Sequence, residues 1–113
     1  MIAGARPPRA PARTAGVFAA LGDPTRLAIV NRLSDGSRRS IVQLSEGHPL
    51  TRQAITKHLR VLERARIVRH ERAGRERLYV LDPAPIEDIR RYVGWVSSQW
   101  DARLARLKAL VEE

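Results

Sequence analysis

The sequence predicts a mainly α-helical domain with one small β-hairpin, in the order α-α-α-α-β-β-α. Apolar residues recur at intervals of three and four positions in several segments, which is the pattern of helices that bury one face. Capping residues and turn formers separate these segments. Two short β-type segments that flank a glycine follow the fourth of them, and this arrangement is typical of a hairpin. With 113 residues, the chain is long enough for one domain with a single core.

The N-terminal third predicts an irregular arm followed by two helices. Residues 1–14 are rich in Pro, Ala and Arg without periodicity, which indicates a disordered basic arm that precedes a folded domain over 15–113. A short helix follows over 15–21. Asp23 then suits the N-cap of a second helix, Pro24–Leu33, because proline is favoured at the first helical position. The residues of this helix expected to face the core are Leu27, Ile29, Val30 and Leu33.

The middle of the chain predicts two helices joined by a tight turn. Ser40 can cap a short helix over 41–46. Residues 47–49, Gly-His-Pro, indicate a turn because glycine allows a positive φ angle and proline cannot continue a helix. Thr51 can cap a fourth helix over 52–65. The apolar positions of that helix are spaced by four and then three residues, so they share one face. They are Ile55, Leu59 and Leu62.

The C-terminal part predicts the hairpin and a long helix. Residues 67–73 and 77–81 have strand character, and Gly74 and Arg75 lie between them at the expected tip. From residue 85 to about 111, apolar residues repeat at alternating steps of three and four, which resembles the seam of a coiled coil with one stutter. We expect this helix to form a dimer, through Ile89, Val93, Val96, Trp100, Leu104 and Leu107. Trp95 is one position off this seam and can pack against the body of the domain.

The charge of the chain favours a polyanionic partner. There are 21 Lys and Arg against 12 Asp and Glu, which gives a formal net charge of +9. A basic protein that is merely soluble, or one of ribosomal type, would have the same balance. The chain contains no cysteine, which excludes disulfides, thiolate metal sites and cysteine nucleophiles. It also has no long apolar run and no apolar signal segment, so we expect a cytoplasmic protein.

The two middle helices fit a helix-turn-helix that binds double-stranded DNA. The major groove is wide enough to admit a helix, and the second helix has a polar outer face. Arg52 can fork onto guanine and Gln53 can pair with adenine through two hydrogen bonds. The other residues of this end of the helix expected to reach a base or a phosphate are Thr51, Thr56, Lys57 and Arg60. Taken alone, the same pattern also describes an ordinary amphipathic helix with a solvated polar face.

The hairpin strengthens the DNA-binding interpretation. A thin cationic hairpin beside a recognition helix suits the minor groove or the flanking backbone. Its charges could instead protect an exposed strand edge from aggregation, or pair with Glu71 and Glu76. The cations of the hairpin are Arg69, Arg72, Arg75 and Arg77.

Three segments together resemble the ArsR family of winged helix-turn-helix regulators. They are LGDPTRL at 21–27, LTRQAITKHLRVL at 50–62 and the hairpin over 67–81. The resemblance extends over about residues 15–111, in the family's order and spacing. The resemblance implies a homodimer that binds an inverted repeat and represses transcription. It also implies base contacts and wing contacts at the matching positions. The base contacts fall at Arg52, Gln53, Thr56 and Lys57, and the wing contacts at Gly74 and Arg75.

The chain departs from the metal-sensing members of this family. Segment 41–46 has no cysteine and the last helix has no histidine, whereas soft and borderline metals require thiolate or imidazole ligands. The sequence therefore resembles a branch that lacks metal ligands. We expect no metal and no cofactor, and the branch implies either a small organic effector or no direct ligand.

Other functions fit the sequence less well. An enzyme would need a converged nucleophile, base or metal site, and the three histidines are scattered. A winged-helix module that binds protein or RNA would favour apolar anchors or stacking aromatics on the outer face of helix 52–65, where the chain has polar residues instead. An activator or a non-specific DNA binder remains an alternative to a repressor.

Overall fold

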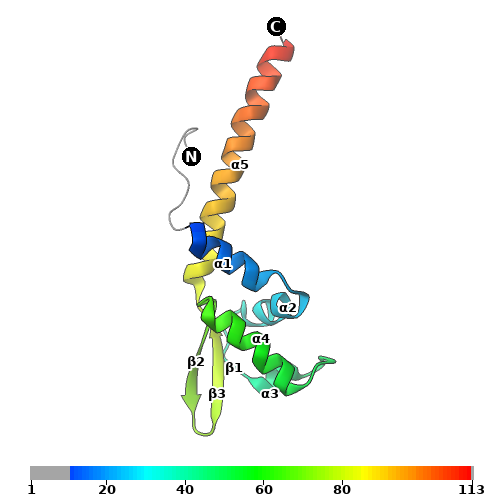
Figure 1. Cartoon of the computed structure of the whole chain (residues 1–113), viewed down its shortest axis with the longest axis vertical. Helices are drawn as coiled ribbons and strands as arrows, with labels where there is room; N and C mark the ends of the chain where they lie inside the picture. Colours follow the sequence, from blue (N-terminus) through cyan, green and yellow to red (C-terminus); the bar gives the residue numbers. More distant parts are fainter. Residues whose placement is uncertain (1–10, 113) are drawn as a thin grey trace.

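The computed structural model describes residues 11–112, and it confirms the mainly α-helical fold with a β-hairpin (Figure 1). None of the helices in this range combines the length and the apolar character needed to cross a membrane. The helices are α1 (Pro11–Leu21), α2 (Pro24–Leu33), α3 (Ile41–Ser45), α4 (Arg52–Arg64) and α5 (Pro83–Glu112). The strands are β1 (Arg39–Ser40), β2 (Val68–Ala73) and β3 (Glu76–Leu81).

The sheet has one strand more than the sequence predicts. Its order is β1-β3-β2, and both pairings are antiparallel. Strand β1 consists of two residues, with Arg39 opposite Tyr79 and Ser40 opposite Leu78. A segment this short cannot show the alternation of apolar and polar residues that identifies a strand, so only tertiary packing reveals it.

Three helices begin at the predicted capping residues. Asp23 accepts a hydrogen bond from the backbone N–H of Arg26 at 3.1 Å, and Thr51 accepts one from the N–H of Ala54 at 3.1 Å. Ser40 and Gln43 form a capping box, in which each side chain accepts a hydrogen bond from the other residue's backbone N–H. These contacts satisfy N–H groups that have no partner inside a helix.

The predicted boundary of the N-terminal arm is wrong for residues 11–14, because α1 begins at Pro11 and Thr14 is buried. Proline has no N–H to leave unsatisfied, so it suits the first turn of a helix and does not indicate disorder there. The same reason explains why α5 begins at Pro83, two residues before the predicted start. The remainder of the predicted arm, residues 1–10, lies outside the described residues.

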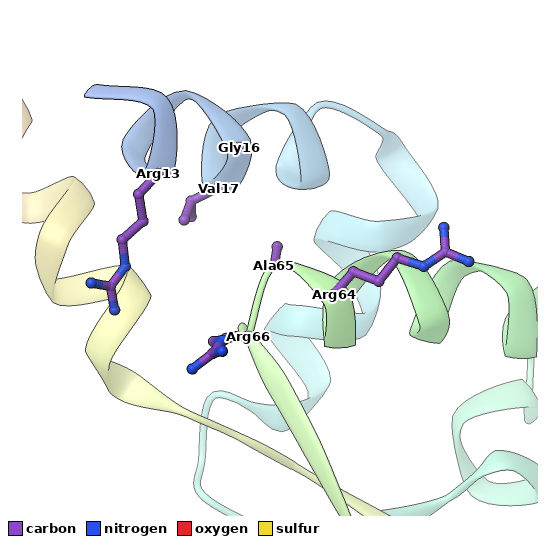
Figure 2. A pocket seen from close by; sticks show the side chains of 6 residues that line it. All are labelled: Arg13, Gly16, Val17, Arg64, Ala65 and Arg66. Carbon is purple, nitrogen blue, oxygen red and sulfur yellow. The ribbon is translucent and has the colours of Figure 1, made fainter. Parts of the chain in front are cut away.

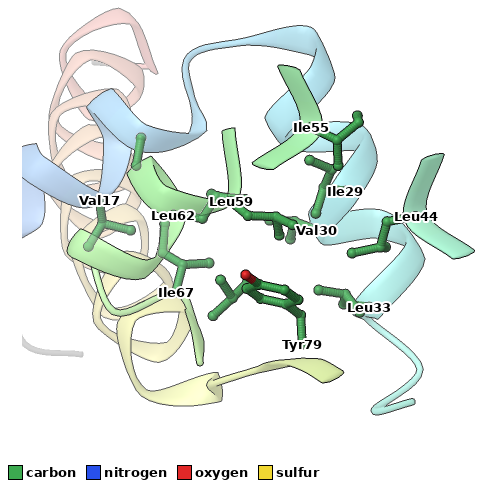
Figure 3. Packing of buried hydrophobic residues seen from close by; sticks show 12 residues of the cluster. Val17, Ile29, Val30, Leu33, Leu44, Ile55, Leu59, Leu62, Ile67 and Tyr79 are labelled. Carbon is green, nitrogen blue, oxygen red and sulfur yellow. The ribbon is translucent and has the colours of Figure 1, made fainter. Parts of the chain in front are cut away.

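The core lies between the helices α1 to α4 and the sheet (Figure 3). Its central side chains come from every one of these helices and from β2 and β3. Leu27 does not join them, contrary to the prediction, because it lies on the solvent side of α2 and is nearly half exposed. The largest wholly buried side chains are Ile29, Leu33, Leu44, Ile55, Leu59, Leu62, Ile67 and Tyr79.

Helix α5 packs on the body through its first half and projects from it through its second half (Figure 1). The Phe18 ring of α1 meets the Tyr92 ring edge-on at 5.8 Å, and Tyr92 contacts Trp95 at 6.3 Å. Ile89 packs against the core of its own chain. The projection gives a radius of gyration of 18.6 Å, whereas a compact domain of about 100 residues has about 13 Å.

Candidate nucleic-acid interface

Helix α4 points its predicted DNA-binding residues away from the body. Its apolar face is completely buried, so the polar face must lie on the outside. There it meets the exposed side of α3, and the two helices enclose a surface depression of about 620 Å³. The structure therefore brings most of the predicted site residues into one place. The residues that line the depression are Ile41, Val42, Arg52, Gln53, Thr56, Lys57 and Arg60.

The polar side chains of this face are free to bind a partner. No described residue forms a hydrogen bond or an ion pair with the side chains of Arg52, Gln53, Lys57 or Arg60, and all four are exposed. Thr56 is different, because its hydroxyl donates to the backbone carbonyl of Arg52 at 2.8 Å. It can still accept a hydrogen bond through its oxygen lone pairs. The predicted residue Thr51 is exposed, and its hydroxyl oxygen caps α4.

His58 supports the recognition helix from behind. Its Nδ1 atom lies 3.3 Å from Nη1 of Arg26 and 3.7 Å from Oδ2 of Asp23. The hydrogen bond from the backbone N–H of Arg26 is the main reason why the pKa of Asp23 lies below its usual value, and the nearby His58 lowers this pKa further. His58 therefore ties α4 to the start of α2 and does not face the outer depression.

Sequence analysis missed the contribution of α3 to this surface. Val42 is 41% exposed and lies beside the polar face of α4. Leu44 is buried and Ile41 packs against the core, so Val42, which lies about 100° around the helix from Ile41, points elsewhere. The spacing of these three residues could have shown that Val42 faces outward.

The hairpin formed by β2 and β3 keeps several cations without partners. Arg72 and Arg77 lie directly opposite each other in the pairing register, and like charges in that position are destabilising. Arg75 follows Gly74 in the turn between the two strands, and Gly74 has the positive φ angle of 65° that this turn requires. None of these three arginines has an ion pair with a described residue. The interpretation that the hairpin charges pair with one another holds only for Arg69, which contacts Glu71 at 3.2 Å.

The hairpin tip and α3 lie at the end of the molecule opposite to the C-terminus of α5 (Figure 1). The hairpin and α3 thus belong to the same end of a chain with a net charge of +9, and the polar face of α4 lies beside α3. Both surfaces carry cations, which favours a polyanionic partner.

The histidines do not gather into a ligand set. His70 contacts Glu63 at 2.6 Å, whereas His58 faces Asp23 and His48 lies in the turn before α4. Within residues 11–112, no three side chains of His, Asp or Glu lie together in a way that could hold a metal ion.

A family model described as a helix-turn-helix domain matches residues 21–71. The chain is 42% identical to the HTH-type transcriptional regulator Rv2034 of Mycobacterium tuberculosis, over 63% of this chain and 65% of that protein. It is 38% identical to the HTH-type transcriptional repressor SmtB of M. tuberculosis, over 68% of this chain and 57% of that protein. The chain thus spans less than two thirds of the length of these two relatives.

A solved structure gives a longer match. The ArsR-like transcriptional regulator from Rhodococcus sp. RHA1 superimposes with a TM-score of 0.74 and 37% identity, and the match covers 88% of this chain and 92% of that one. These relatives are regulators of transcription and not enzymes. Together with the matched helix-turn-helix and the winged-helix topology, they show that the chain belongs to the ArsR family of winged helix-turn-helix transcriptional regulators.

Proposed function

We propose that this DNA-binding regulator is a sequence-specific repressor that binds an inverted-repeat operator as a homodimer. The observation that carries the proposal is the outer face of α4, where exposed polar side chains without partners surround one depression. A helix held in this way, with its apolar face fully buried, is a rigid support for base recognition.

Base recognition is assigned to the first turns of α4. Arg52 donates two hydrogen bonds to guanine and Gln53 pairs with adenine, and Lys57 reaches a base or a phosphate one turn later. Thr56 acts as an acceptor, since its hydroxyl hydrogen is used within the helix. Thr51 and Arg60 lie at the edges of this surface and contact phosphates.

The wing contributes affinity without base recognition. Arg75 at the tip and the opposed pair of Arg72 and Arg77 neutralise phosphates, which also relieves their mutual repulsion. Gly74 allows the backbone of the tip to approach the DNA closely, because glycine adopts the positive φ angle without strain.

The second half of α5 is the proposed dimer interface. Trp100 is 59% exposed, and Leu104 and Leu107 are exposed to a similar extent on the same stripe of the helix. Val93 and Val96 extend this stripe toward the body, whereas Ile89 is already packed in its own chain. A second copy related by a two-fold axis would cover the stripe and place two recognition helices about 34 Å apart, one turn of DNA.

Repression is supported by the relative SmtB, which is named a transcriptional repressor. The location of the protein follows from its binding partner, which is DNA. A regulator that occupies DNA acts in the compartment of the chromosome, which we propose to be the cytoplasm. A bound metal is not part of the proposal, because among residues 11–112 no three side chains of His, Asp or Glu lie close enough together to hold one.

The test is fluorescence-anisotropy binding to the DNA upstream of the protein's own gene and to a scrambled duplex, at two salt concentrations. The expected result is tight, salt-sensitive binding with an affinity ratio of about 10³ or more between the two duplexes. Equal, weak affinity for both duplexes would leave three interpretations: a non-specific binder, an operator elsewhere in the genome, or a protein-interaction module.

A further inference from the structure

A second surface of interest lies at the far end of the recognition helix. Here α1 faces the turn between α4 and β2, and the two border an open pocket of about 470 Å³ (Figure 2). This volume is within the range of about 300–1,000 Å³ that is typical of small-molecule sites. The lining residues are Arg13, Gly16, Val17, Arg64, Ala65 and Arg66.

The pocket combines an apolar wall with cations. Val17, Gly16 and Ala65 form the wall, whereas Arg13 and Arg66 extend on the same side of the pocket. Figure 2 shows that the Arg64 side chain points away from this side. Its positive charge interacts favourably with the partial negative charge at the carboxyl end of α4. None of the described residues that line it is acidic. This arrangement suits a molecule with an apolar body and an anionic oxygen group.

Arg66 is held in an unfavourable backbone conformation. Its φ is 61°, and it is the only non-glycine residue with a positive φ among residues 11–112. Its N–H donates to the carbonyl of Glu63 at 2.9 Å, and the N–H of Ile67 donates to the carbonyl of Leu62 at 3.0 Å. This is the helix ending in which glycine is most common at the position of Arg66. An arginine in this conformation lowers the stability of the fold, and residues with strained backbones are more frequent at functional sites.

The cations of the pocket are only partly neutralised. Arg13 lies 3.8 Å from a carboxylate oxygen of Asp88 on α5, and this exposed pair is loose. Arg66 has no hydrogen bond or ion pair from its side chain to a described residue. Hydrogen bonds between a guanidinium group and a carboxylate or phosphate are about twice as strong as neutral ones. An anion can therefore bind Arg66 and share Arg13 with Asp88.

We propose that this pocket binds a small organic anion and that the anion regulates DNA binding; the regulatory part rests on the proposed function. The pocket joins α1, which packs on α5 through Phe18 and Tyr92, to the end of the recognition helix. An anion held between Arg13 and Arg66 fixes the angle between α5, which carries the proposed dimer interface, and α4, which carries the proposed base contacts. It lies about 18 Å along α4 from Arg52, so it does not occupy the DNA surface itself.

The first experiment measures binding to the full chain by calorimetry, with benzoate, phenyl phosphate and the neutral benzamide as probes. Benzoate and phenyl phosphate distinguish a carboxylate from a phosphate ligand. We expect saturable binding of at least one of them and binding of benzamide that is at least about tenfold weaker. Failure of both anions to bind, or equal binding of benzamide, would overturn the proposal.

Arg66→Gly is the decisive variant. It removes the cation and also relieves the positive φ angle, so the protein should melt no lower than the wild type. The dissociation constant of the anion should rise at least about tenfold in this variant. Arg13→Gln should also raise the dissociation constant of the anion. Arg106→Gln, on an exposed position near the end of α5, removes the same charge far from the pocket and should leave anion binding unchanged. Unchanged binding in Arg66→Gly, or an equal loss in Arg106→Gln, would contradict the assigned pocket.

The regulatory part is tested by the DNA affinity of the wild type with and without the bound anion, at matched ionic strength. We expect a change of at least about fivefold, which Arg66→Gly abolishes. Anion binding without any change in DNA affinity would overturn the regulatory part alone. Anion binding by a protein with no specific DNA affinity would overturn the proposed function and leave the pocket standing.

Discussion

Helices α4 and α5 both carry an apolar stripe, but only α4 buries it within its own chain. Ile55, Leu59 and Leu62 are fully buried, so α4 offers its polar face to the surroundings. In the second half of α5, Trp100 and Leu104 are more than half exposed. The difference is that α4 buries its stripe within one chain, whereas the stripe of α5 stays exposed, as surfaces that bind another protein often are.

The same chemical change should have different consequences in the two helices. Leu59→Ala leaves a cavity in the core and should lower the free energy of unfolding by about 2–5 kcal/mol at every protein concentration. Leu107→Ala removes a side chain that is exposed in one chain, so its effect should depend on protein concentration. Urea denaturation at several protein concentrations measures both effects. If the two variants lost the same free energy of unfolding at every protein concentration, the proposed difference between the helices would be wrong.

A charge on the stripe of α5 should separate the subunits. Val96→Asp places a carboxylate within the proposed interface, where burial without a partner is costly, so the dissociation constant of the dimer should rise at least about a hundredfold. Ala105→Asp adds the same charge on the exposed opposite side of the helix and should leave the dimer intact. Sedimentation equilibrium measures both variants, and a stable Val96→Asp dimer would place the interface elsewhere.

The wing should affect DNA affinity less than the dimer interface does. Arg75→Ala should weaken binding to all duplexes alike. The plot of log K against log salt should become less steep, its negative slope shrinking in magnitude by about 1, because one phosphate contact is lost. Anisotropy titrations over a range of salt give this slope. A selective loss on one sequence would show that Arg75 recognises bases or the width of the minor groove.

The smallest predicted effect concerns acid stability. The pKa of Asp23 is lowered in the folded protein, so its charged form stabilises the fold above the usual aspartate pKa, and this contribution is lost as the pH falls through the lowered value. Asp23→Asn keeps a capping oxygen without the charge and should lose less stability between pH 7 and pH 3 than the wild type. Melting temperatures at the two pH values test this, and an identical loss would show that the charge of Asp23 contributes nothing.

The elements that were predicted correctly are those whose signals are local. Asp23, Ser40 and Thr51 mark the helix starts because their side chains bond N–H groups three residues away. Strand β1 escaped prediction because two residues carry no periodicity. The place of Val42 beside the polar face of α4 was not predicted either, because it depends on how α3 packs against α4, although the spacing within α3 already indicates that Val42 faces outward.

The pocket between α1 and the α4–β2 turn shows the same limit. Arg13 and Arg66 are more than fifty positions apart in the sequence, and the start of α1 at Pro11 was not foreseen. Only the packing of α1 over the end of α4 brings them to one pocket.

The most direct test of the role of α4 is the ratio of affinities for the upstream DNA and a scrambled duplex, measured for the wild type and for Arg52→Ala and Gln53→Ala. Each substitution should cost about 1–3 kcal/mol on the upstream DNA and much less on the scrambled duplex, so the ratio should fall. Equal losses on both duplexes would contradict base recognition by the exposed face of α4.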